Sequence, residues 1–198
     1  MKAVLYIHGR GGSAEEAEHY KPLFPDCDVF GLHYRGQTEF LAGREIGAAV
    51  NAFRQKYDEI VLIANSIGAY FSMRAGIEEK IARAFFISPI VDMEKLIVDM
   101  MAMENVTEEE LEEKGRIPTA FGEVLSWEHL TFVRQNPIKW SVPTHILYGR
   151  EDAFTDVNTI RAFAETHGAT LTVMENGEHW FHTDEQMAFL DDWIRRTK

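Results

Sequence analysis

The chain has 198 residues, a length sufficient to bury the core of one compact domain. Of these residues, 45% are hydrophobic and 26% are charged. Its formal net charge of −12 disfavours a nucleic acid or an anionic membrane as partner, because either would repel an acidic surface. A single cysteine, Cys27, excludes an intramolecular disulfide, and no stretch reaches the roughly 18 to 20 apolar residues of a membrane helix, so we expect a cytoplasmic protein.

The predicted elements alternate between strands and helices. Apolar runs predict strands over residues 2–7, 28–34, 59–64, 81–87, 144–147 and 170–173. Between them, Ser13 can cap a helix that Pro22 ends, and apolar residues at helical spacing predict helices over 39–57, directly after residue 66, over 157–166 and over 184–195. This alternation is typical of parallel β-α-β units in a doubly wound sheet.

The stretch at residues 90–140 interrupts this alternation. It holds about fifty residues without a convincing strand, which is too long for a plain loop in a compact domain. Helical patterns cover residues 93–101, residues 108–114 after the cap Thr107, and roughly residues 121–134. We therefore expect a helical cap inserted between the fourth and fifth strands of a single domain.

Ser66 follows the third expected strand in the segment Ala64-Asn65-Ser66-Ile67-Gly68. A sharp strand-to-helix turn lifts the serine hydroxyl above the edge of the sheet, and it needs small residues two positions before and after the serine, here Ala64 and Gly68. The following helix directs backbone N–H groups toward the hydroxyl, where they can stabilise an oxyanion. The pattern predicts a nucleophile, but an ordinary turn serine fits the same five residues.

This segment resembles the nucleophile elbow, G-x-S-x-G, of the α/β-hydrolase family, with Ala64 in place of the first glycine. The resemblance covers nearly the whole chain, although two amino-terminal strands of larger relatives are missing. It implies an α/β fold with a doubly wound, mostly parallel six-stranded sheet in the order 2-1-3-4-5-6. Ser66 would lie on a central strand, and the chain would form one domain with a cap at about residues 90–140.

A glycine-rich turn, His8-Gly9-Arg10-Gly11-Gly12, follows the first expected strand. Similar His-Gly turns in the family hold an oxyanion donor, so the resemblance implies this role for the backbone N–H groups of Arg10 and Ile67. A dinucleotide loop is disfavoured, because the G-x-G-x-x-G spacing is incomplete and the second strand ends in His33-Tyr34-Arg35 without a ribose-binding acid. A turn with no catalytic role is the plain alternative.

Asp152 follows the fifth expected strand and matches the family's G-x-x-D pattern. In that position a carboxylate holds the catalytic histidine in the productive tautomer and stabilises the imidazolium. Glu151 and Asp156 are competing acids, and acids in turns also serve solubility alone. The position within the motif favours Asp152.

His179 lies in the loop after the last expected strand, in the segment Gly177-Glu178-His179. This segment resembles the Gly-x-x-His and Gly-His patterns of the family, with one residue between the glycine and the histidine. His182 is the alternative, and we assign it to the start of the last helix. The two histidines lack a third ligand of matching spacing, so we expect no metal. The resulting order, Ser66, Asp152, His179, is the one that this fold requires.

These residues predict a serine hydrolase that cleaves an ester or related acyl bond of a small-molecule substrate without a cofactor. A peptidase for short peptides and a non-catalytic binding module on the same fold are the alternatives. The expected pocket includes His8, Gly9, Tyr34, Arg35 and Trp180. Arg35 could contact a substrate carboxylate or pair with a surface acid.

Overall fold

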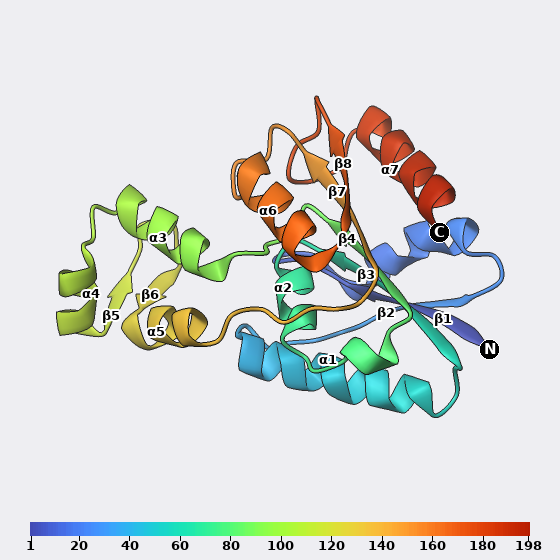
Figure 1. Cartoon of the computed structure of the whole chain (residues 1–198), viewed down its shortest axis with the longest axis horizontal. Coiled ribbons are helices and arrows are strands. Elements are labelled where there is room, and N and C mark those ends of the chain that lie inside the picture. Colours follow the sequence, from blue (N-terminus) through green and yellow to red (C-terminus); the bar gives the residue numbers. More distant parts are fainter. The chain divides into compact units, whose positions relative to one another are not determined.

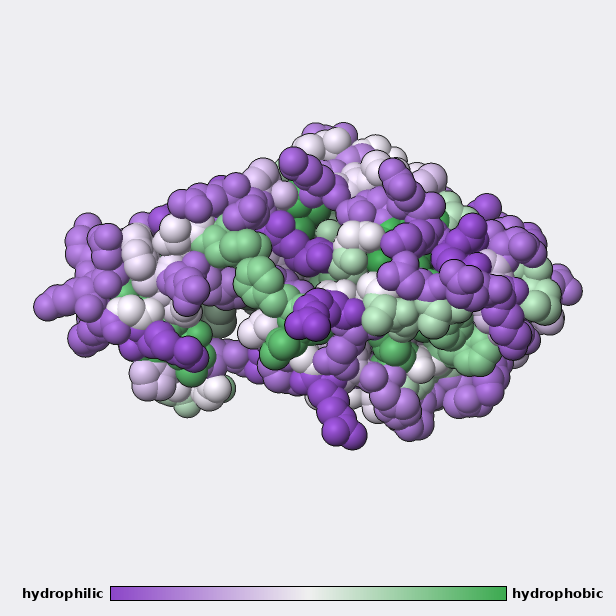
Figure 2. Space-filling model, turned by 90° about the horizontal axis from the view of Figure 1, so that it is seen from below, coloured by the Kyte–Doolittle hydropathy of each residue, from purple (hydrophilic) through white to green (hydrophobic).

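The computed structural model describes all 198 residues and forms two compact units. The larger unit contains residues 1–91 and 139–198, and the smaller unit contains residues 92–138. The face drawn in Figure 2 is mostly hydrophilic, with apolar residues in separate patches. None of the helices has both the length and the apolar character required to cross a bilayer.

The larger unit is built on a six-stranded parallel sheet in the order β2-β1-β3-β4-β7-β8 (Figure 1). The strands are β1 (Lys2–Ile7), β2 (Asp28–Gly31), β3 (Glu59–Asn65), β4 (Arg83–Ile87), β7 (Thr144–Gly149) and β8 (Thr170–Met174). This confirms the expected fold class and strand order. The second strand ends three residues earlier than expected, because after Leu32 donates its N–H to Tyr6 the chain leaves the sheet.

Helices cover both faces of this sheet (Figure 1). They are the 3-10 helices η1 (Ala14–Leu23) and η2 (Glu78–Lys80) and the α-helices α1 (Glu39–Arg54), α2 (Ile67–Met73), α6 (Val157–His167) and α7 (Asp184–Thr197). The side of the sheet facing η1 and α7 carries a cluster of buried apolar residues that includes Tyr6, Val61, Phe85, Leu147 and Trp193. Covering on both faces explains why the central strands are almost continuously apolar.

Side-chain caps fix where the main helices begin. Thr38, Asp156 and Thr183 each accept a hydrogen bond from a backbone N–H in the first turn, at α1, α6 and α7 respectively. The first helical segment is a 3-10 helix, and Pro22 lies next to its end, where proline has no N–H to donate to a preceding carbonyl. Each cap marks the point where the loop after β2, β7 or β8 ends and the following helix begins.

The smaller unit mixes helices with one hairpin. It contains α3 (Met93–Met103), α4 (Glu108–Lys114), the antiparallel strands β5 (Arg116–Pro118) and β6 (Val124–Ser126), and α5 (Trp127–Gln135). The insertion, expected to be helical, also contains this hairpin, and its last helix begins at Trp127 rather than near residue 121. Three-residue strands are too short to show alternation in the sequence.

Candidate active site

Ser66 occupies a strained turn between β3 and α2. Its φ of 53° and ψ of −124° lie in a region that residues with a side chain rarely adopt. The Ser66 N–H donates to the carbonyl of Ile87 at 3.0 Å, and the Ile90 N–H donates to the Ser66 carbonyl at 3.1 Å. Because both backbone groups are bonded to the chain at the end of β4, the strained conformation is held in place.

Small residues around Ser66 are required by close backbone approaches. A Cβ added at Gly68 would lie 2.5 Å from the carbonyl oxygen of His8 and 2.7 Å from that of Ile7. A Cβ added at Gly9 would lie 3.0 Å from the Cβ of Ser66. The start of α2 therefore packs directly against the end of β1, and the His-Gly turn lies beside the serine.

Ser66, His179 and Asp152 form one chain of hydrogen bonds. The Oγ of Ser66 lies 2.8 Å from Nε2 of His179, and Nδ1 of the same imidazole lies 2.7 Å from Oδ2 of Asp152. The side chains of His179 and Asp152 are 6% and 0% exposed. The second carboxylate oxygen, Oδ1, accepts the N–H groups of Phe154 at 2.7 Å and Thr155 at 3.2 Å. The carboxylate is therefore oriented at both oxygens.

The competing residues lie elsewhere. Asp156 caps α6 by accepting backbone N–H groups in its first turn. Glu151 is exposed and lies beyond the end of β7. His182 is exposed, and its Nδ1 lies 2.7 Å from the carbonyl of Trp180. No group of three or more potential metal ligands is present in the chain.

The loop that carries Asp152 packs against the loop that carries His179 at Gly149, the glycine of the G-x-x-D pattern, and at Gly177. A Cβ added at Gly149 would lie 2.4 Å from the carbonyl carbon and oxygen of Gly177. The Glu151 N–H also donates to the Gly177 carbonyl at 2.9 Å. The loops that carry Asp152 and His179 are thus in backbone contact, which sets the separation between carboxylate and imidazole.

Two aromatic rings flank the imidazole of His179. The ring of Phe154 lies 4.6 Å from it and that of Trp180 lies 5.4 Å from it, between centroids, and the two rings contact each other edge to face at 5.6 Å. Phe154 and Trp180 are 45% and 57% exposed. Phe154 was not predicted, because its proximity to the base depends on how the loop after β7 folds.

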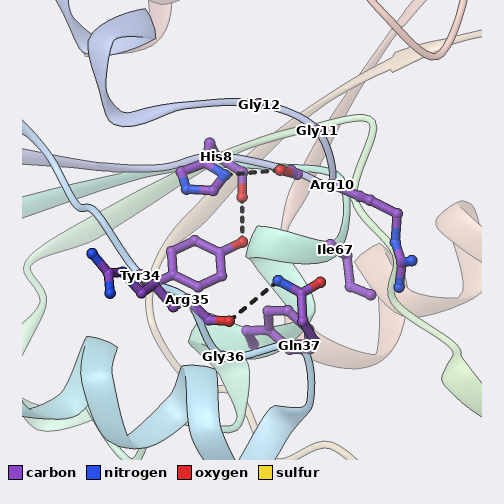
Figure 3. A pocket seen from close by; sticks show the side chains of 11 residues that line it. His8, Arg10, Gly11, Gly12, Tyr34, Arg35, Gly36, Gln37 and Ile67 are labelled. Carbon is purple, nitrogen blue, oxygen red and sulfur yellow. Dashed lines mark hydrogen bonds between the residues drawn. The ribbon is translucent and has the colours of Figure 1, made fainter.

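The His-Gly turn is anchored by Tyr34. The Tyr34 hydroxyl donates to the carbonyl of His8 at 2.7 Å, and the phenol stacks on the imidazole of His8 with centroids 4.4 Å apart (Figure 3). Burial raises the pKa of Tyr34 to about 12, so the phenol remains a neutral donor. This anchor fixes the backbone that leads into Gly9 and Arg10. Ile67, directly after the serine, is the first residue of α2, and an N–H at that position of a helix has no intrahelical acceptor.

A family model described as an uncharacterised protein family, UPF0227, matches residues 3–188. The chain belongs to UPF0227. Sequence comparison of this family member with curated proteins gives no significant match.

Solved structures share the fold of this UPF0227 member at low sequence identity. Est1E from Butyrivibrio proteoclasticus, with ferulic acid bound, has a TM-score of 0.75 and 17% identity over 99% of this chain and 87% of its own. The α/β hydrolase domain-containing protein 10 from mouse has a TM-score of 0.68 and 15% identity, covering 98% and 88%. The Pyrococcus furiosus esterase Pf2001 has a TM-score of 0.62 and 20% identity, covering 98% and 79%. The likeness establishes the α/β-hydrolase fold.

Two cavities of the UPF0227 member adjoin the turn at residues 9–12. The first measures about 320 Å³, and its lining includes His8, Tyr34, Arg35 and Ile67 (Figure 3). The second measures about 370 Å³, and its lining includes Ser66 and Trp180. Residues 9–12 line both cavities. The expected pocket residues are therefore divided between two cavities that share one wall.

Glu16 stabilises that shared wall. Its carboxylate accepts the N–H of Ser13 at 2.9 Å and the hydroxyl of the buried Tyr6. Glu16 also lines the second cavity. The bonds connect the end of the glycine-rich turn to the core of the sheet, so the turn is held from both ends.

Proposed function

We propose that the protein is a serine hydrolase that cleaves a carboxylic ester, or a related acyl bond, of a small organic substrate through an acyl-enzyme. The observation that carries the proposal is the continuous chain of hydrogen bonds from Ser66 through His179 to Asp152. A binding module needs neither a base within reach of a serine nor a buried acid to orient that base. The esterases that share the fold are consistent with a hydrolase scaffold, but they do not identify the substrate.

In the acylation step, Nε2 of His179 takes the proton of Ser66 as Oγ attacks the carbonyl carbon. The resulting tetrahedral oxyanion accepts hydrogen bonds from the backbone N–H groups of Arg10 and Ile67. As the intermediate collapses, the imidazolium gives its proton to the departing alcohol, which leaves the acyl group on Ser66. Asp152 stays ionised and stabilises the imidazolium.

Deacylation repeats these transfers with water. Nε2 of His179 takes a proton from the attacking water, a second tetrahedral intermediate forms, and its collapse returns the proton to Ser66 and releases the acid. Each oxyanion donor of this kind typically contributes about 10²–10³-fold to the turnover rate. The mechanism requires no cofactor.

A fluorophosphonate probe tests the nucleophile. We expect labelling of the wild-type protein and none of Ser66→Ala. Ser88→Ala is the matched control, because Ser88 follows the neighbouring strand β4 and also has a positive φ, of 42°, while its buried Oγ has no hydrogen-bond partner. Labelling that persists in Ser66→Ala would place the reactive nucleophile at another residue and contradict the role of Ser66. No labelling of folded wild-type protein would favour a binding module.

A substrate panel tests the reaction class. We expect turnover of short p-nitrophenyl esters by the wild-type protein and a loss of at least about 10³-fold in Ser66→Ala. Aminoacyl anilides serve as the comparison. Turnover of the anilides alone would identify a peptidase and contradict the ester proposal.

A further inference from the structure

We propose that the substrate carries an anionic group, a carboxylate or a phosphate, and that Arg35 binds this group while the scissile carbonyl lies at Ser66. This inference rests on the proposed function and adds the substrate class to it. Four features support this inference: the charges that line the first cavity, the contacts of Arg35, the anchoring of the loop that carries Arg35, and the position of the cavity beside Ser66.

The first cavity is lined by basic side chains in an acidic protein. The chain has 32 acidic and 20 basic residues, yet the lining of this cavity includes Arg10 and Arg35 and no aspartate or glutamate. Figure 3 shows the two arginines extending to opposite sides of the view, with Tyr34 and Ile67 between them. An arginine side chain in a cavity whose lining holds no carboxylate attracts anionic ligands more than cationic ones.

The guanidinium of Arg35 makes no hydrogen bond or ion pair within the chain. The hydrogen bonds of this residue all involve its backbone: the N–H donates to Glu45 at 3.0 Å, and the carbonyl accepts from Gln37 at 3.2 Å. Glu45 could have neutralised the guanidinium, but its carboxylate instead accepts the backbone N–H groups of Arg35 and Gly36. The positive charge of Arg35 therefore remains available to a ligand.

The loop that presents Arg35 is firmly anchored. The two hydrogen bonds to Glu45 attach it to α1, and a Cβ added at Gly36 would lie 2.2 Å from the backbone nitrogen of Ala42. The preceding residue, Tyr34, is buried and bonded to the His8 carbonyl. An arginine on an anchored loop loses less conformational entropy on binding, and its planar guanidinium suits the two oxygens of a carboxylate or phosphate.

The cavity lies next to the reacting atoms. Gly9 and Arg10 line both this cavity and the one that contains Ser66, and Ile67 follows the serine directly. Because Ile67 lines the first cavity and directly follows the serine, a substrate held at Ser66 can extend past Ile67 toward Arg35. The volume of about 320 Å³ suits a chain or ring of modest size.

Pairs of esters test the inference, each comparing an anionic group with a neutral group at the same position. One pair places the charge on the acyl side: the p-nitrophenyl esters of adipic acid and of its monoamide. A second pair places it on the leaving group: 4-acetoxybenzoate and 4-acetoxybenzamide. A phosphate version, 4-acetoxyphenyl phosphate, is compared with 4-acetoxybenzamide. The uncatalysed rate of each ester is subtracted, because a carboxylate can attack its own ester.

We expect wild-type protein to prefer the anionic member of at least one pair, and Arg35→Gln to lower that preference in kcat/KM by roughly 5- to 10-fold. Arg35→Lys should retain part of the preference for the anionic ester, because lysine keeps the positive charge but lacks the planar guanidinium. Arg161→Gln is the matched control: Arg161 is exposed on α6 and lines neither cavity, so its loss changes net charge equally.

The outcomes separate the two proposals. If no ester is hydrolysed, the proposed function fails. If the amides are hydrolysed as fast as the anions, or if Arg35→Gln leaves the preference unchanged, the anionic substrate class is wrong while the hydrolase remains. An equal loss in Arg161→Gln would attribute the preference to overall charge and overturn the role of Arg35. Carboxylate and phosphate are distinguished by which of 4-acetoxybenzoate and 4-acetoxyphenyl phosphate is preferred more strongly over 4-acetoxybenzamide.

Discussion

The contact between Gly149 and Gly177 makes the substitution Gly149→Ala an informative test of how the site is held together. An added Cβ would lie 2.4 Å from the carbonyl carbon and oxygen of Gly177, and both contacts are with backbone that no side-chain rotation can relieve. The loop that carries His179 must therefore move away from the one that carries Asp152. Overpacking of this kind costs about 1–3 kcal/mol in the free energy of unfolding.

In a chain of this length, that cost corresponds to a fall of about 2 to 12 °C in Tm, which circular dichroism measures. Displacing a catalytic group by about 1 Å can lower turnover about 10²-fold, so we expect a fall of that order in kcat for p-nitrophenyl butyrate. The assay is run well below both melting temperatures, so that unfolded protein does not contribute.

Gly168→Ala is the control for stability alone. Gly168 ends α6 with a φ of 64°, and an added Cβ would meet no atom within 4 Å. Alanine there costs about 1 kcal/mol through backbone strain, without displacing either loop. Wild-type kcat in Gly149→Ala, or an equal loss of kcat in Gly168→Ala, would contradict a role for the Gly149–Gly177 contact in positioning the two loops.

Three other substitutions test the roles of individual contacts. Asp152→Asn should lower kcat about 10³–10⁴-fold with little change in fold, because an amide at this position favours the wrong imidazole tautomer; steady-state kinetics and circular dichroism check both parts. Glu16→Gln should lower the free energy of unfolding by about 1–2 kcal/mol in urea titrations, because the charged acceptor for Tyr6 is lost, and it should also reduce kcat through a looser glycine-rich turn. Burial lowers the pKa of His145, so the unfolded chain binds a proton at this imidazole more readily than the folded chain. The free energy of unfolding of the wild type should therefore fall relative to that of His145→Gln as the pH drops through about 6.5. A difference in free energy that stays constant between pH 5 and 8 would contradict this.

Much of the fold could be predicted because the strands of the larger unit are buried on both faces. Runs such as residues 59–64 are continuously apolar for this reason, and their alternation with helices leaves few possible topologies. The β5–β6 hairpin was missed because each strand has three residues and pairs only with its neighbour. The end of β2 was misplaced because Tyr34 is buried by the site rather than by the sheet.

For the candidate site, sequence patterns identified Ser66, Asp152 and His179 because each follows a strand whose carboxyl end lies at one edge of the sheet. The supporting contacts could not be predicted in the same way. Phe154 contacts His179 across loops far apart in the sequence, and the approach of Gly149 to Gly177 depends on the separation of two backbones. No sequence pattern near Glu45 indicates that its carboxylate accepts the backbone N–H groups of both Arg35 and Gly36.

The conformation of Ser66 has a consequence for stability. An L-amino acid is disfavoured at this φ and ψ by about 1–3 kcal/mol. The fold retains the serine there because its N–H donates to Ile87 at the end of β4 and its carbonyl accepts from Ile90 just beyond that strand. Glycine adopts such dihedral angles without penalty. Ser66→Gly should therefore abolish the proposed hydrolysis and yet melt at a higher temperature than the wild type, because glycine removes the backbone strain at the position of the proposed nucleophile.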